Sequence, residues 1–359
     1  MELTNQPNRT LYFDILRILA TFAVIFHHSC SEFCEENNFN TDWNGRNIYD
    51  SAVRWCVPII VMISGALFLN PEKHISIKKL YTKNIVRIIV AFFLWSTIYS
   101  AYNFFINNDH NLIGFALNIF YGPPFHFWFL FMIVGVYITI PILRLIAQNK
   151  TVTKYFLIMA FVFTFILPLS LSITSKLLPT IISNGGSIIS LLYHYFESLD
   201  LALFAGYSGY FLLGYYLNAN KCKYTNLIYT IGILSFIAIG GGTVLSFYIF
   251  GEFKDFLYKY LTPFVLFEAI AVFLFVKNLT PRIKFSTKAI NMITKISNMC
   301  FGIYLVHILV LWLLSHYGIS TNKFSTIISI PTISILVFAI SLFISSCLYK
   351  IPFCRKYMM

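Results

Sequence analysis

Long apolar runs alternate along the chain with short segments that hold most of its charged residues. The runs are about twenty residues long, which is the length that an α-helix needs to cross the hydrocarbon core of a bilayer. The pattern predicts an all-α polytopic membrane protein with about ten transmembrane helices. The segment 175–200 is open to a second interpretation, in which it also dips into the membrane. The predicted spans are residues 11–29, 52–70, 85–106, 127–147, 155–174, 201–218, 226–249, 260–277, 297–317 and 325–349.

Composition supports this class and excludes two others. Of the 359 residues, 58% are hydrophobic and 11% are charged, whereas about a quarter of the residues in a soluble domain are charged. The net charge of +12 does not indicate nucleic-acid binding, because Lys and Arg gather at the ends of the runs, where they orient helices and contact anionic lipid. The first run is too long and too charged for a cleavable signal peptide. We expect residues 1–359 to form a single membrane-embedded domain without an appended soluble domain.

The distribution of basic residues predicts the orientation of the helices. With the N-terminus in the cytoplasm, 19 of the 26 Lys and Arg residues lie in inner segments and 5 lie in outer segments. The other two, Arg17 and Arg54, lie within spans. The positive-inside rule therefore predicts that both termini are cytoplasmic.

The first apolar run holds the ionisable residues Asp14, Arg17, His27 and His28. An ionisable group at bilayer depth costs roughly 2.5–3.5 kcal/mol on insertion scales, so such groups usually face the protein interior and mark function. Arg17 and His28 are separated on an ideal helix by about 16 Å of rise and ~20° of rotation. Their side chains are therefore expected on one helix face, near opposite ends of the span. Asp14 is three residues before Arg17, close enough to pair with it.

Several short motifs resemble those of the acyltransferase 3 family of integral membrane O-acyltransferases. In that family, an Arg that is followed by ten residues and a His is thought to serve acyl-CoA. The basic stretch before the third helix is similar as well. The matching residues are Asp14, Arg17 and His28 in the first run, Pro58, Met62, Ser64 and Gly65 in the second, His126, Trp128, Tyr137 and Pro141 in the fourth, and Phe301 to His307 in the ninth.

The resemblance implies an O-acyltransferase of the bacterial cytoplasmic membrane. Its donor would be cytoplasmic acyl-CoA, with acetyl-CoA expected and succinyl as the alternative acyl group. Its acceptor would be a hydroxyl of a cell-surface polysaccharide or of the lipid-linked precursor. Arg17 would help to hold the CoA phosphates, and His28 would be the general base, since imidazole titrates near working pH. Alternatively, Asp14 and Arg17 form a neutralised pair that locks helices together, and the histidines only cap the outer end of the helix.

Two further groups of residues are candidates for binding acyl-CoA. Lys79, Lys83 and Arg87 are spaced four residues apart, so they are expected on one helix face at the cytoplasmic border. Such a basic face suits the phosphates of CoA, although positive-inside anchoring also explains Lys79 and Lys83. The small pair Ser64 and Gly65 allows a slim ligand or another helix to approach closely.

The acceptor site is expected near the outer side. His126 lies there together with His28, and the two could share one site, with Trp128 stacking on a sugar. Tyr137 of the same run is a further candidate for binding the acceptor. The alternative for Trp128 and Tyr137 is the aromatic belt of a membrane border. Arg54, just inside the outer boundary, either binds an anionic acceptor or extends its side chain to the interface.

Two other spans hold ionisable residues near their middle, Glu268 in the eighth and His307 in the ninth. A carboxylate at that depth is seldom accidental, and we expect Glu268 to neutralise a deep arginine or to orient a histidine. The role of His307 is left open. An outer segment also holds His194, Glu197 and Asp200, which either bind acceptor or belong to a solvated loop.

The main rival function is a secondary transporter or a polysaccharide exporter, which would also need many helices and buried charges. Transporters often show two related halves with paired broken helices, and this sequence shows no such repeat. A purely structural scaffold would not explain so many ionisable groups within spans. The seven Cys residues have no metal-ligand spacing, and neither a metal nor a permanently bound cofactor is expected. The oligomeric state is left open.

Overall fold

The computed structural model describes residues 10–31, 41–73, 75–106, 111–120, 125–181, 190–191, 206–250, 255–322 and 325–359. All regular structure in these ranges is helical. Within them, nine helical segments are long and apolar enough to cross a membrane. The prediction of an all-α polytopic membrane protein is therefore confirmed, and the cytoplasmic placement of the termini stays a prediction.

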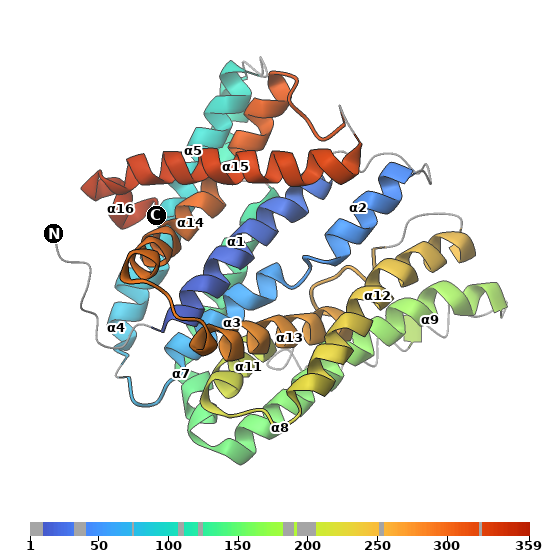
Figure 1. Ribbon diagram of the computed structural model, residues 1–359. Helices are drawn as coiled ribbons and strands as arrows, with labels where there is room; N and C mark the ends of the chain where they lie inside the picture. The colour runs from blue at the N-terminus through green and yellow to red at the C-terminus, as the bar shows by residue number, and fades with distance from the viewer. Residues whose placement is uncertain are drawn as a thin grey trace. The chain divides into compact units, whose positions relative to one another are not determined.

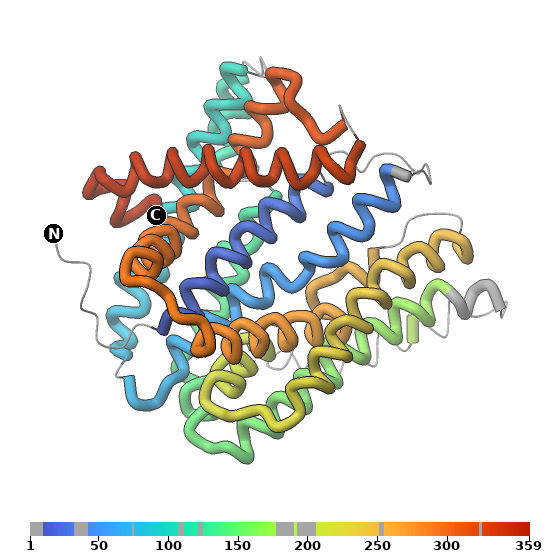
Figure 2. Tube along the Cα trace, viewed as in Figure 1, coloured from blue at the N-terminus to red at the C-terminus, as the bar shows by residue number. Residues whose placement is uncertain are grey.

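The helices form two compact units, and the chain passes between them more than once. Unit 1 comprises residues 1–34, 74–141 and 284–359, and unit 2 comprises residues 35–73 and 142–283. Figure 1 shows how the chain contributes its two ends and a middle section to unit 1, and Figure 2 traces the same path as a tube. Each unit is thus assembled from segments that lie far apart in the sequence.

Unit 1 is centred on α1, which packs against α14 and α15, while α15 also packs against α14 (Figure 1). The short C-terminal helix α16 packs against α5 and α15. The indole of Trp95 on α5 donates a 3.3 Å hydrogen bond to the carbonyl of Met358, which fixes this C-terminal segment. The elements of unit 1 are α1 (Leu11–Ser31), α4 (Ile77–Lys79), the π-helical turn η1 (Leu80–Ile85), α5 (Val86–Phe105), α6 (Leu112–Phe120), η2 (Phe125–Phe127), the first part of α7 (Trp128–Gln148), α14 (Thr287–His316), α15 (Thr326–Tyr349) and α16 (Pro352–Tyr357).

In unit 2, α3 packs along α11, and α12 packs along α13 (Figure 2). Less extensive packing joins α11 to α8, α12 to α2 and α13 to α3. The elements of unit 2 are α2 (Thr41–Ser51), α3 (Cys56–Phe68), the last part of α7, α8 (Lys150–Ala160), the π-helical turn η3 (Phe161–Ile166), α9 (Leu167–Ile181), α11 (Ser208–Ala219), α12 (Thr225–Phe250), α13 (Pro263–Leu279) and η4 (Thr280–Arg282).

The predicted spans correspond to these helices with shifts at their ends. The largest shift is in the ninth span, which was expected from residue 297 and begins ten residues earlier, at Thr287. Ser286 explains this start, because its hydroxyl accepts the backbone N–H of Ala289 and caps the helix. The part of the sixth span that the structure describes begins at residue 206. It contains the 12-residue helix α11, which begins at Ser208. Most of the segment 175–200 lies outside the described residues.

Two glycines bring α3 and α11 into backbone contact. A Cβ atom added to Gly65 would lie 1.7 Å from the carbonyl oxygen of Phe211, and one added to Gly214 would lie 2.0 Å from that of Met62. No side chain fits in either place. The two helices can therefore approach as closely as they do only because both positions lack a side chain, as in other membrane helix pairs with small interface residues.

Candidate active site

At the N-terminal end of α1, Asp14 and Arg17 form the expected pair. The Nη1 atom of Arg17 lies 3.1 Å from Oδ1 of Asp14 and donates a 2.7 Å hydrogen bond to the hydroxyl of Ser297 on α14. The same hydroxyl donates to Oδ1 of Asp14 at 2.7 Å. Asp14 is buried, whereas 29% of the Arg17 side chain is exposed. Arg17 is thus held by α1 and α14 while part of its side chain stays accessible.

Near the other end of α1, three histidines from three elements lie together. We call His28, His126 and His307 the histidine cluster. The ring centroid of His28 lies 6.2 Å from that of His126 and 5.2 Å from that of His307, and the last two are 5.1 Å apart. All three side chains are buried. The structure therefore brings His28 and His126 together as the sequence predicted, and it adds His307.

Hydrogen bonds fix how the cluster is held. The hydroxyl of Tyr304 donates to the backbone carbonyl of His126, and Nδ1 of His307 bonds to the carbonyl of Tyr304. Since a carbonyl only accepts, Nδ1 of His307 carries a proton, and in the neutral ring Nε2 is then an acceptor. Among the described residues, neither this Nε2 nor either ring nitrogen of His126 has a hydrogen-bond partner. These nitrogens are therefore positioned to meet a polar group that enters the cluster.

Aromatic side chains surround the cluster and keep it apolar. Tyr99 lies with its ring centroid 5.7 Å from that of His126, and Phe125 lies 5.2 Å from His28. The Tyr99 hydroxyl donates to the carbonyl of Leu305 at 2.9 Å and accepts the N–H of Leu309 at 3.0 Å. Tyr99 thus locks α5 against α14 beside the histidines. In the described part of the chain, no group of His, Cys, Asp or Glu is arranged to hold a metal ion.

The three basic residues of the third predicted span lie in three consecutive elements, Lys79 in α4, Lys83 in η1 and Arg87 in α5, and their sharing one helix face stays a prediction. Lys79, Lys83 and Arg87 are all exposed, and Lys83 lies in the π-helical turn η1. Such turns are frequent at functional sites. The guanidinium of Arg87 lies 5.5 Å from the ring centroid of Phe301 and within electrostatic range of Tyr137. Arg87 is therefore oriented by α14 and α7.

Trp128 and Tyr137 occupy different positions on α7. Trp128 is the first residue of the helix and is 39% exposed. Tyr137 is half-buried and belongs to the surroundings of Arg87. Trp128 follows directly on η2, the turn that carries His126. The substrate-binding roles of both residues stay predictions.

In unit 2, Arg54 already has a carboxylate partner. It forms an ion pair with Asp50, its guanidinium lies 4.3 Å from the ring centroid of Tyr258, and its Nη1 donates a 3.4 Å hydrogen bond to the carbonyl of Tyr258. Burial raises the pKa of the Tyr258 phenol, so the phenol stays neutral and donates a hydrogen bond to the side chain of Asn47. Arg54 is thus a paired and stacked residue, which reduces its attraction for an anionic acceptor.

Glu268 also belongs to unit 2, on α13, and is only 4% exposed. Its Oε2 atom has no hydrogen-bond partner among the described residues. The residue borders a mostly apolar cavity of about 430 Å³, together with Trp55 and Tyr229. A buried polar atom without a hydrogen-bond partner is costly, so Glu268 stays a functional candidate.

Ser64 and Gly65 are accounted for by packing in unit 2. Gly65 is the contact point of α11, and the hydroxyl of Ser64 donates to the carbonyl of Ile60 one turn earlier at 3.0 Å. Of the two alternatives for this pair, the close approach of another helix is the one that the geometry explains. Its role toward CoA stays a prediction.

Sequence reasoning left the role of His307 open and did not single out Tyr304. Both lie in the motif from Phe301 to His307, three residues apart and therefore on one helix face. This spacing in the sequence could have indicated that the two side chains act at the same place. The candidates His194, Glu197 and Asp200 lie outside the described residues.

Comparison with known families gives this geometry a context. Residues 10–349 match the model of the acyltransferase 3 family, which is described as an acyltransferase domain. No curated protein matches, and no solved structure matches. The matched range covers almost the whole chain and includes the Asp14–Arg17 pair and the histidine cluster. The chain therefore belongs to the acyltransferase 3 family of membrane acyltransferases.

Proposed function

We propose that this acyltransferase moves an acetyl group from cytoplasmic acetyl-CoA to a hydroxyl of a cell-surface polysaccharide or of its lipid-linked precursor. The protein would act in the bacterial cytoplasmic membrane. The observation that supports this proposal best is the meeting of His28, His126 and His307 within unit 1. His28 lies on α1, the helix whose other end holds Asp14 and Arg17.

The proposed reaction is a direct transfer with His28 as the general base. His28 removes the proton from an acceptor hydroxyl, and the oxygen attacks the thioester carbonyl of acetyl-CoA. The carbon–sulfur bond then breaks, an ester forms, and the CoA thiolate takes up the proton that His28 holds. A positioned base of this kind typically contributes 10²–10⁴-fold to the rate. The Nε2 acceptor of His307, 5.2 Å away between ring centroids, supports a shared proton in this cluster.

The donor is proposed to extend along α1. Arg17 and His28 are eleven residues apart on one described helix, which corresponds to about 16 Å of rise. An extended pantetheine arm has a similar length. Arg17, whose side chain is partly accessible, would hold the CoA phosphates together with Lys83 and Arg87, and Asp14 would position Arg17.

The first experiment is to measure thiol release from acetyl-CoA by the purified full chain, with acetyl-CoA binding measured in parallel. We expect wild type to bind and to release thiol, and His28→Ala to bind but to release thiol at least 100-fold more slowly. His316→Ala is the matched control, because this histidine is exposed at the end of α14 and is not part of the histidine cluster.

Two results would contradict the proposal in different ways. Thiol release by His28→Ala at the wild-type rate would remove His28 from the mechanism. Failure of wild type to bind any acyl-CoA would refute acyl-CoA as the donor substrate. Transport driven by an ion gradient would then become the leading function. Because turnover without an acceptor is expected to be slow, the binding measurement decides between these cases.

A further inference from the structure

The described part of unit 1 carries a large excess of positive charge. Among its described residues there are eleven Lys and Arg, whereas Asp14 is the one acidic side chain and is paired with Arg17. The basic residues lie near the predicted cytoplasmic ends of the spans, so membrane anchoring explains part of the excess. The described basic residues of unit 1 are Arg17, Lys78, Lys79, Lys83, Arg87, Lys284, Lys288, Lys295, Lys350, Arg355 and Lys356.

Two of these residues lie on α16, the short helix that follows the last span and is fixed to the rest of unit 1. The helix packs against α5 and α15 (Figure 1), and the carbonyl of Met358 directly after it accepts the indole N–H of Trp95. Cys354 is buried, whereas Arg355 and Lys356 are exposed. Anchoring of a span requires positive charge but no defined position for it. The fixed position of α16 therefore points to a further role for its basic residues.

The contacts of Arg355 connect it to a residue that is proposed to hold CoA. The guanidinium of Arg355 lies 5.7 Å from the ring centroid of Tyr349, and Arg87 lies within electrostatic range of the same tyrosine. Arg87 also contacts Phe301 on α14, the helix that holds Arg17. Like charges that approach one ring repel each other, and an anion that binds both guanidinium groups relieves this repulsion. Arg87 and Arg355 thus suit an anionic ligand.

The proposed donor has phosphates in a matching arrangement. CoA carries a diphosphate and, beyond it, a 3′-phosphate on the ribose, which is the phosphate farthest from the thioester. Such a phosphomonoester carries about −1.5 to −2 charges near neutral pH, and an arginine can bind it through two parallel hydrogen bonds. Because Asp14 neutralises Arg17, most of the charge of three phosphates must be balanced by other basic residues.

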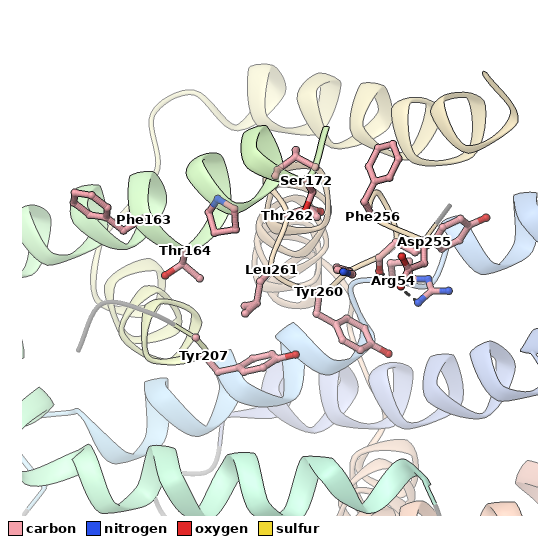
Figure 3. Close-up of a pocket in the computed structure, with 15 residues that line it drawn as sticks. Arg54, Phe163, Thr164, Ser172, Tyr207, Asp255, Phe256, Tyr260, Leu261 and Thr262 are labelled. Carbon is pink, nitrogen blue, oxygen red and sulfur yellow. Dashed lines mark hydrogen bonds between the residues drawn. The ribbon is translucent and has the colours of Figure 1, made fainter. Parts of the chain in front are cut away.

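The charges that line a cavity in unit 2 show a different pattern. Figure 3 shows Arg54 and Asp255 among the side chains around this cavity, which has a volume of about 640 Å³. Arg54 is paired with Asp50, and the other charged residues of the described lining, Asp255 and Lys259, have opposite signs. A phosphate site needs an excess of accessible positive charge. The described lining of this cavity lacks that excess, whereas α16 and the start of α5 have it.

We propose that Arg355 binds the 3′-phosphate of the acyl-CoA donor beside Arg87, and thereby selects CoA over thioesters that lack this phosphate. The inference rests on the proposed function for the identity of the donor, and it adds a specificity-determining residue within unit 1. The contacts run from Arg17 through α14 to Arg87 and from there through Tyr349 to Arg355. Arg355 is the residue of this series farthest from α1 along these contacts, as the 3′-phosphate is the phosphate farthest from the thioester.

The test compares two thioesters in binding to the purified full chain in a nonionic detergent. These are acetyl-CoA and acetyl-dephospho-CoA, which lacks only the 3′-phosphate. We expect wild type to bind acetyl-CoA about tenfold more tightly, as for one charge-assisted contact. Arg355→Ala should lose this preference and keep its affinity for acetyl-dephospho-CoA, and Arg355→Lys should keep part of it. Lys150→Ala is the matched control, because it removes an exposed positive charge from unit 2.

Arg355→Gln is the second variant if Arg355→Ala does not fold, because it keeps most of the stem that packs on Tyr349. The proposal is overturned if wild type binds the two thioesters equally, or if the folded Arg355 variants keep the full preference. An equal loss of affinity for both thioesters would show that α16 acts only through packing, and would overturn it as well. A wild type that binds acetyl-CoA without this preference leaves the proposed function standing, whereas a wild type that binds neither thioester removes both.

An anionic lipid head group has the same phosphate chemistry, and a second measurement separates the two sources. The thermal midpoint of the solubilised protein is recorded with added phosphatidylglycerol and with added phosphatidylcholine. We expect phosphatidylglycerol to shift the midpoint of Arg355→Ala as much as that of wild type. A shift that is lost in Arg355→Ala but kept in Lys150→Ala, together with an unchanged preference for acetyl-CoA, would assign Arg355 to lipid and overturn the proposal.

Discussion

In unit 1, His126 and His307 hold ring nitrogens that have no hydrogen-bond partner among the described residues, in surroundings made mostly of aromatic rings. In unit 2, the buried guanidinium of Arg54 has a carboxylate partner, a ring beneath it and a carbonyl within reach. Unsatisfied buried groups cost free energy and are kept where chemistry uses them. Unit 2 also holds buried atoms without a partner among the described residues, among them Oε2 of Glu268 and Nε of Arg54. What distinguishes unit 1 is that its unsatisfied nitrogens lie together in one cluster of three histidines, and this clustering supports unit 1 as the place of the proposed transfer.

The largest effect should come from removing a second histidine of the cluster. We expect His307→Ala to lower the rate of acetyl transfer by 100-fold or more, because it removes the Nε2 acceptor of a ring whose centroid lies 5.2 Å from that of His28. His307→Gln keeps a polar end and should recover part of the rate. The measurement is kcat as a function of pH. An unchanged pH profile with only a lower yield of folded protein would show that His307 acts in packing alone, and the contrast between the units would lose its basis.

A smaller effect, on stability, should come from closing the gap between α3 and α11. Gly65→Ala places a methyl group where the carbonyl of Phe211 lies, so the helices must separate, at a cost of about 1–3 kcal/mol or more. The readout is the thermal midpoint of the detergent-solubilised protein. Gly241→Ala is the matched control, since a Cβ there meets no heavy atom of the described structure within 4 Å. Equal midpoints for the two variants would refute the backbone contact.

The smallest effect should come from Ser297→Ala, which removes the α14 partner of Arg17 and Asp14 while leaving their pair intact. One such hydrogen bond contributes about 0.5–1.5 kcal/mol. We expect the KM for acetyl-CoA to rise by up to tenfold at unchanged kcat, because only the position of Arg17 is affected. Ser315→Ala, at the far end of α14, is the control. A fall in kcat without a change in KM would assign this end of α1 to the chemical step.

The helices could be predicted from sequence because their apolar lengths match the bilayer, and this constraint is local. The Asp14–Arg17 pair was predictable for the same reason, since three residues on a helix fix the distance. Ser297 was not, because it meets the pair from a position 280 residues away. Nothing in the local sequence of α14 indicates that contact.

The histidine cluster shows the same limit. Helix ends and the predicted topology placed both His28 and His126 at the same side of the membrane, whereas His307 was expected near the middle of its span. The described helix begins at Thr287 and ends at His316, so His307 lies 20 residues after its start and 9 residues before its end. The capping residue Ser286 decides this boundary, and a polar first half of a helix is difficult to recognise from hydropathy. The ion pair of Arg54 was missed for a similar reason, because its partner Asp50 lies before residue 52, the predicted start of the span.

The local pairing of Asp14 with Arg17 has a consequence for how the chain enters the membrane during synthesis. Ser297 is 280 residues away, which at about 5–20 residues per second means a delay on the order of tens of seconds before α14 emerges from the ribosome. Throughout that interval α1 must reside in lipid with two charged side chains. Because the partners are one turn apart on the same helix, each charge is neutralised as soon as the helix forms. The nascent chain can therefore release α1 to the bilayer early, and α14 joins a helix that is already electrically balanced.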